Sequence, residues 1–211
     1  DDPEYPFMQN VEAKNEVITG IQKLFPGMPE GDGSATFFVD QNAVKKACPS
    51  CVAIALFNQA TNAPSFGGGT KAPLRGSAPI TLFVYSQNLR EMIWKNILDS
   101  EWVREFWPQA NIADKPVWVD KLKKKDIIPT ASIGMLRGLL WQPAYLYMDW
   151  ISSQEASICP CCGRTSYDFC EFFRKNKFQY ELSGPNWRHP HSPYIYDEKK
   201  NELEVLSFNK G

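Results

Sequence analysis

Six cysteines are the residues whose type and spacing most clearly indicate chemistry. Four of them form two CxxC pairs, Cys48 with Cys51 and Cys159 with Cys162. Two residues between ligands let both sulfurs reach one ion from a tight turn, and Gly163 after the second pair helps that turn close. Four thiolates satisfy Zn²⁺ tetrahedrally and leave no open position for a catalytic water. The spacing therefore predicts one structural zinc ion that joins two distant parts of the chain.

A redox-active CxxC and incidental buried cysteines are the alternatives to this zinc site. Cys161 could replace one ligand, but the spacing of three positions favours Cys159 and Cys162. Cys170 follows Phe169 in an aromatic-rich run, so we expect it in the core. No secretion signal precedes these cysteines, and their clustering is more typical of metal binding than of disulfides. We therefore expect a reducing, cytoplasmic location.

The residues give little support for catalysis. The only two histidines, His189 and His191, flank a proline and make a poor chelate for a catalytic metal, so a structural loop is favoured. The GxSxG, HExxH and GxxxxGK[ST] motifs are absent from the sequence. We predict a protein that is not an enzyme, with a zinc hydrolase as the remote alternative. The net charge of −1 excludes an overall basic field, so any nucleic-acid contact needs a local patch.

A mixed set of short elements must position these residues. Apolar spacing predicts helices over 12–25, 52–60, 89–106 and 133–140, and strands over 80–85, 178–182, 194–196 and 203–208. We expect the long helical pattern to point Leu89, Met92, Ile93, Ile97 and Leu98 inward, and the core to form around Ile54, Leu56, Phe83 and Ile93. The last strands suit a β-meander. The sequence predicts an α+β fold, a mixed single globular domain over residues 1–211 with a small antiparallel sheet.

Loops with small or basic residues could contact a ligand backbone. Three glycines, Gly67, Gly68 and Gly69, follow one another, and a ligand can approach such a main chain closely because it has no Cβ. A plain flexible loop is the alternative. Basic residues lie downstream, including Lys177 on an expected turn. A denser cluster is typical of a solvated face or a phosphate-contacting patch, and it consists of Lys121, Lys123, Lys124 and Lys125.

Read together, these segments resemble the CasA family, the large subunit of the type I-E CRISPR surveillance complex Cascade. The matching segments keep the family order and span nearly the whole chain. They are Pro6–Gln9, Cys51–Ala60, Ala63–Gly69, Leu74–Gly76, Ser132–Gly134, Arg137–Gly138, Trp141–Ala144, the CxCCG run at 159–163 and His189–Pro193. No single segment is decisive, but the ordered set is highly specific.

The resemblance implies an internal fragment of the larger N-terminal domain of such a subunit, without its N-terminal segment and C-terminal helical bundle. It implies recognition of the protospacer-adjacent motif (PAM) of foreign double-stranded DNA through the minor groove, with recruitment of an effector helicase-nuclease. The other Cascade subunits and the guide RNA are the implied partners. The residues that the resemblance assigns to DNA binding are Phe38, Val39, Asp40, Ser65, Phe66, Gly67, Gly68, Gly69 and Lys177.

The sequence departs from the family pattern at two of these positions. Asp40 replaces the family's asparagine, and a carboxylate near DNA repels phosphate and cannot donate a hydrogen bond. Ser65 replaces a glycine. The family's glutamine wedge, which helps to part the strands, would lie beyond Gly211. The alternative function is a zinc-stabilised scaffold domain that binds protein or RNA without reading DNA.

Overall fold

The computed structural model describes residues 2–25, 28, 43–61, 73–75, 80–106, 114–176, 179–198 and 202–206. Two compact units interleave along the sequence. Unit 1 combines Asp1–Ala60 with Gln142–Phe178, and unit 2 combines Thr61–Trp141 with Gln179–Gly211. Short helices accompany a small antiparallel sheet and a four-cysteine cluster, which confirms the predicted α+β class. The assignment of residues 1–211 to a single domain stays a prediction.

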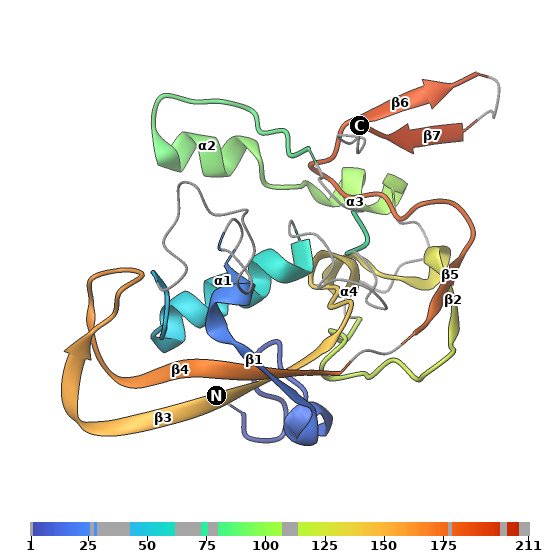
Figure 1. The fold of residues 1–211 in the computed structure, drawn as a ribbon. Helices are drawn as coiled ribbons and strands as arrows, with labels where there is room; N and C mark the ends of the chain where they lie inside the picture. Colours follow the sequence, from blue (N-terminus) through green and yellow to red (C-terminus); the bar gives the residue numbers. More distant parts are fainter. Residues whose placement is uncertain are drawn as a thin grey trace. The chain divides into compact units, whose positions relative to one another are not determined.

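Unit 1 is built on a three-stranded antiparallel sheet in the order β1-β4-β3. Its strands are β1 (Val17–Gly20), β3 (Tyr145–Ile158) and β4 (Thr165–Asn176), and its helices are η1 (Val11–Asn15), η2 (Ile21–Leu24) and α1 (Pro49–Thr61). Figure 1 shows β3 and β4 as one long hairpin. Central strand β4 pairs Phe173 with Met148 on one side and with Thr19 on the other.

The core of unit 1 lies where this sheet meets the N-terminal segment and α1. The side chains of Met8, Leu56, Met148 and Phe173 are buried. A buried amide side chain also contributes a hydrogen bond to this core, because the Met148 N–H donates to the Gln9 side-chain oxygen at 2.9 Å. This core holds the N-terminal segment against the hairpin and so positions the start of α1.

Unit 2 holds short elements. They are α2 (Leu89–Lys95), α3 (Ser100–Phe106), β2 (Ile127–Pro129), η3 (Thr130–Ser132), α4 (Met135–Leu139), β5 (Glu181–Ser183), β6 (Tyr194–Asp197) and β7 (Glu202–Val205). Strands β2 and β5 pair in parallel, and β6 and β7 form an antiparallel hairpin. No helix among the residues described is long and apolar enough to cross a membrane.

Large aromatic side chains form the core of unit 2. The Trp141 indole N–H donates to the Tyr180 hydroxyl at 2.9 Å, and the Trp187 indole N–H donates to the Ile133 carbonyl at 3.1 Å. Trp187 packs directly on Gly138 of α4, where a Cβ would overlap the indole ring. The absence of a side chain at this position therefore permits the close packing.

The helix predicted over 12–25 is wrong. The chain forms the two 3₁₀ turns η1 and η2 with strand β1 between them. Val17 and Ile18 are β-branched, and pairing with β4 supplies the backbone partners that a helix would otherwise provide. The helix expected over 52–60 is confirmed and begins slightly earlier, at Pro49.

The predicted buried strand at 80–85 is also wrong. Residues 80–85 form no regular strand, and Phe83 is 61% exposed. The expected helix over 89–106 forms as two helices, because Asp99 accepts hydrogen bonds from the N–H groups of Glu101 and Trp102 and starts α3. Among the side chains expected to point inward, Leu89, Ile93 and Ile97 are exposed, and Met92 and Leu98 are half-buried.

The remaining expectations are met in part. Helix α4 confirms the helix expected over 133–140 at shorter length, and β6 and β7 confirm the last two strands. The meander is incomplete, because β5 pairs in parallel with β2 instead of with β6. Of the four predicted core residues, Leu56 is buried, whereas Ile54, Phe83 and Ile93 are exposed. Short apolar runs did not distinguish a buried strand from an exposed segment.

Candidate metal centre and functional surfaces

The first cysteine pair lies at the start of α1. The Val52 N–H donates to the Cys48 carbonyl at 3.0 Å, which closes the first helical turn. Pro49 stands at the first helical position, where its fixed φ suits the helix and no backbone donor is lost. Cys51 lies within this first turn. The N-terminal end of α1 therefore carries both sulfurs, and burial raises the pKa of the Cys48 and Cys51 thiols.

The second pair forms a knuckle at the tip of the β3–β4 hairpin. The Cys159 N–H donates to the Arg164 carbonyl at 2.8 Å, and the Gly163 N–H returns to the Cys159 carbonyl at 2.9 Å. Gly163 has a φ of +72°, in the left-handed region that a side chain disfavours. The turn thus needs glycine at this position, and it points Cys159 and Cys162 in the same direction.

The four predicted ligands meet at one place. Their sulfurs all lie within 4.8 Å of one another. The Cys48 and Cys162 sulfurs are 3.7 Å apart, and the Cys51 and Cys159 sulfurs are 4.0 Å apart. Four sulfurs at ~2.3 Å from a tetrahedral ion would be ~3.8 Å from one another. The arrangement therefore fits one metal ion with four sulfur ligands.

Burial and backbone donors set the acidity of these thiols. Burial would raise the pKa of Cys159, but hydrogen bonds from the N–H groups of Cys48, Cys162 and Cys161 lower it to about 6. The Cys48 N–H, for example, lies 3.4 Å from the Cys159 sulfur. Burial and hydrogen bonding to Cys162 and Cys48 instead raise the pKa of Cys51. Cys159 is thus the cysteine of the cluster whose pKa the backbone hydrogen bonds lower, and its thiolate form is favoured.

The two remaining cysteines lie outside this cluster. The Cys161 sulfur faces the Lys46 carbonyl at 3.8 Å, and burial raises its pKa to about 11. Cys170 is fully buried, and its S–H donates to the Phe172 carbonyl at 3.0 Å. Its position in the core confirms the expectation from the aromatic run.

The four-cysteine cluster lies within a chain that a known family covers from end to end. The sequence profile of CRISPR-associated protein Cse1 matches residues 1–211. The chain belongs to the Cse1 family. This family, also called CasA, is part of the type I-E system, which confirms the resemblance drawn from the ordered motifs. Cse1 proteins are subunits of a CRISPR surveillance complex.

The DNA-binding positions assigned by resemblance to Cse1 proteins lie outside the described residues. They are Phe38, Val39, Asp40, Ser65, Phe66, Gly67, Gly68, Gly69 and Lys177. Their assignment stays a prediction. The described residues nearest to the glycine run on its C-terminal side are 73–75, and Arg75 is buried there. Its guanidinium donates to the Ile80 carbonyl at 2.8 Å and to the Ser192 hydroxyl at 3.2 Å.

Two members of the lysine cluster of this Cse1 family member, Lys121 and Lys123, line a polar groove of about 400 Å³ in unit 2. Aspartates share the groove. Asp120 pairs with Arg137 at 3.2 Å, and Asp126 accepts from the Lys123 N–H at 2.8 Å. Because carboxylates interleave with the lysines, the groove carries mixed charge. A solvated face accounts for this cluster better than a phosphate site does.

Both histidines serve as packing groups in the unit 2 loop. Burial, Arg75 and His191 lower the pKa of His189 to about 3, so its ring is neutral near pH 7. Its Nδ1 accepts a hydrogen bond from the His191 N–H at 3.1 Å. The His191 ring lies 5.1 Å from the ring of Phe83. These contacts agree with the structural role expected for the loop.

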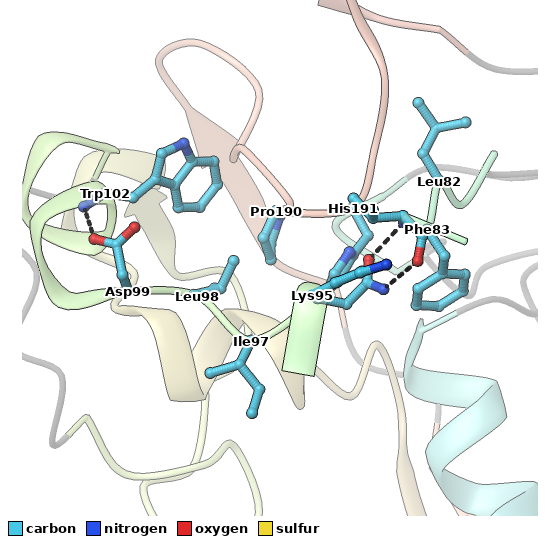
Figure 2. A pocket seen from close by; sticks show the side chains of 11 residues that line it. Leu82, Phe83, Lys95, Ile97, Leu98, Asp99, Trp102, Pro190 and His191 are labelled. Atoms are coloured by element: carbon cyan, nitrogen blue, oxygen red, sulfur yellow. Dashed lines mark hydrogen bonds between the residues drawn. The ribbon is translucent and has the colours of Figure 1, made fainter. Parts of the chain in front are cut away.

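Sequence reasoning missed an apolar groove of about 430 Å³ in unit 2. In Figure 2, Trp102 lies on one side of the groove, and Phe83 and His191 lie on the other. The Asn96 side chain holds the groove wall, since its amide oxygen accepts from the Val84 N–H at 2.8 Å and its NH₂ donates to the Val84 carbonyl at 2.9 Å. Exposed apolar residues continue along α2 at Leu89, Ile93 and Trp94. The groove was missed because the 80–85 run reads as a buried strand.

Proposed function

We propose that this chain reads the PAM of foreign double-stranded DNA within an RNA-guided CRISPR surveillance complex. In this proposal, the glycine run and Lys177 contact the minor groove, and the chain helps to recruit an effector helicase-nuclease. The match of residues 1–211 to the Cse1 family carries the proposal. The four-cysteine site would hold a structural Zn²⁺, because four thiolates are a preferred zinc donor set and complete a closed tetrahedral site.

The chemistry of the minor groove supports a readout by glycine and lysine. That groove is about 6 Å wide and presents a degenerate set of acceptors together with the guanine amino group. Main-chain N–H and C=O groups of Gly67–Gly69 can approach its floor because no Cβ intervenes. Such a readout is loose, which suits a short motif. Base pairing to the guide RNA then supplies the long sequence specificity.

The test compares duplex and single-stranded targets in the reconstituted surveillance complex. Gly68→Trp and Lys177→Ala are measured on a duplex with a matching PAM, on a mismatched duplex and on a single-stranded target. Salt is fixed throughout, because phosphate contacts depend steeply on it. Both variants should weaken capture of the matching duplex, and Lys177→Ala should cost about 1–3 kcal/mol if it contacts a base edge. The single-stranded target should be nearly unaffected, because it needs no strand opening.

A zinc-stabilised scaffold that binds protein or RNA is the second candidate. The apolar groove of Figure 2 and the exposed side chains on α2 favour it, because large exposed apolar patches mark interaction surfaces. Phe83→Ser tests this role. If Phe83→Ser prevents assembly and Gly68→Trp changes nothing, the scaffold function replaces DNA readout. Equal weakening of duplex and single-stranded binding by Gly68→Trp would likewise indicate a role in assembly.

A further inference from the structure

Lys46 links the two chain segments that lead into the cysteine cluster. It precedes Cys48 by two residues, and Ser157 precedes Cys159 by two residues in the other half of the site. The Lys46 ammonium donates to the Ser157 hydroxyl at 2.8 Å. This single contact ties the segment before α1 to the end of β3. It therefore fixes the spacing between the two cysteine pairs from outside the ligand set.

The same ammonium also covers an aromatic ring of the cluster. Its nitrogen lies 4.1 Å from the ring centroid of Phe169, in cation–π geometry. Phe169 is buried, and it packs with Cys48 and Cys159 in one hydrophobic cluster. Lys46 thus holds in place the side chain that packs against one ligand of each pair.

Backbone contacts also hold the segment around Lys46 in place. Ala47 exchanges two hydrogen bonds with Cys170, at 3.0 and 2.9 Å, which pairs this segment with the central strand β4. The Lys46 carbonyl faces the Cys161 sulfur at 3.8 Å. Lys46 therefore contacts the end of β3 through its side chain and the knuckle through its carbonyl. A flexible surface lysine would make neither kind of contact.

Charge gives this placement a further consequence. A divalent ion with four thiolates carries a net charge of about −2. A fixed cation beside such a centre stabilises the metal-bound state more than the metal-free state, because the metal-free site carries less negative charge. We propose that Lys46 is a positioning residue for the metal centre, which aligns the two cysteine pairs and offsets the charge of the bound tetrathiolate. This inference rests on the proposed zinc site.

The test measures zinc affinity of the full chain by competition with a chromophoric chelator at fixed pH and salt. Lys46→Met keeps the aliphatic stem but removes the charge and the donor, and it should weaken zinc binding about tenfold or more. Lys46→Arg keeps both and should restore most of the affinity. Lys45→Met is the matched control, because the neighbouring Lys45 is exposed, and it should bind zinc like the parent chain. Co²⁺ in place of zinc should show an altered tetrathiolate absorption spectrum in Lys46→Met alone.

Two further measurements separate positioning from general stability. The metal-free forms are unfolded in urea, and Lys46→Met should unfold close to the parent midpoint despite its weaker zinc binding. Ser157→Ala removes only the hydrogen bond, and it should give a smaller loss of zinc affinity. If Lys46→Met does not fold, this variant tests whether the contact between Lys46 and Ser157 supports zinc binding. Unchanged affinity in both variants overturns the proposal, as does an equal loss in Lys45→Met. If the parent chain itself fails to bind one equivalent of zinc, the zinc site of the proposed function fails instead.

Discussion

The sulfurs of Cys51 and Cys159 lie 4.0 Å apart although 108 positions separate the two residues. One comes from the first turn of α1 and the other from the tip of the β3–β4 hairpin. A metal ion bound between them would hold a long loop of the chain closed. Closing such a loop costs conformational entropy, and the free energy of metal binding would offset that cost. The stability of unit 1 should therefore depend on the metal.

Removing one ligand should release the metal. At free zinc of about 1,000 times its Kd, binding stabilises the folded chain by about 4 kcal/mol. Cys162→Ser should lose most of this stabilisation and its bound zinc. Cys161→Ser is the matched control, because Cys161 is adjacent but lies outside the four-sulfur cluster. Zinc stoichiometry by elemental analysis and urea unfolding check both. Equal zinc loss in the two variants would contradict the ligand assignment.

A side chain at Gly138 should disrupt the core of unit 2. A Cβ at this position would overlap the Trp187 ring, and that ring is held by its hydrogen bond to Ile133. Overpacking of this kind costs about 1–3 kcal/mol. Gly138→Ala should therefore lower the free energy of unfolding by that amount. Gly20→Ala is the control, because its Cβ would meet nothing closer than 4.0 Å. Similar urea midpoints for both variants would argue against this packing.

Backbone strain should limit substitution at Gly163. Its φ of +72° lies in the left-handed region, while no atom is close enough to clash with a Cβ. Gly163→Ala should cost about 1–2 kcal/mol from conformation alone. Gly163→Asn should cost less, since asparagine tolerates this region better. Unfolding of the metal-bound chain in urea measures the difference. A Gly163→Ala variant as stable as the parent would show that the knuckle tolerates another turn.

The meeting of the four cysteines could be predicted from the sequence because CxxC spacing encodes local geometry. Two residues between sulfurs let both reach one ion from the first turn of α1 as well as from the hairpin knuckle, so the two pairs needed only to be brought together. The β3–β4 hairpin could not be predicted in this way. Residues from Trp150 towards the tip are largely exposed on both faces, so apolar and polar side chains do not alternate. The contact of Lys46 with Ser157 could not be predicted from the sequence pattern either, because the two residues are 111 positions apart.

Acid should weaken unit 2 through His189. Its folded pKa of about 3 lies below the ordinary value of 6.5, so the unfolded chain takes up a proton that the folded chain excludes. This contribution to stability is complete above pH 6.5 and is lost as the pH falls towards 3. His189→Asn keeps an acceptor for the His191 N–H and should show a shallower loss between pH 6.5 and 4. Urea unfolding at several pH values compares this variant with the parent chain. Identical slopes in the two chains would exclude His189 as the cause.

The departure of Asp40 from the family pattern offers a gain-of-function test of DNA readout. If this residue lies near the minor groove, its carboxylate repels phosphate and cannot donate to the acceptors on the groove floor. Asp40→Asn removes the charge and adds a donor, so capture of a duplex with a matching PAM should strengthen severalfold. Glu4→Gln changes the net charge equally at an exposed position of the N-terminal segment, and it should leave capture unchanged. Both variants are assembled into the surveillance complex and measured at two salt concentrations, because a contact near phosphate gives a gain that shrinks as salt rises. Single-stranded targets should bind equally well in all cases, since guide pairing supplies that affinity. An equal gain for Glu4→Gln would assign the effect to overall charge, and no gain for Asp40→Asn would remove Asp40 from the DNA interface.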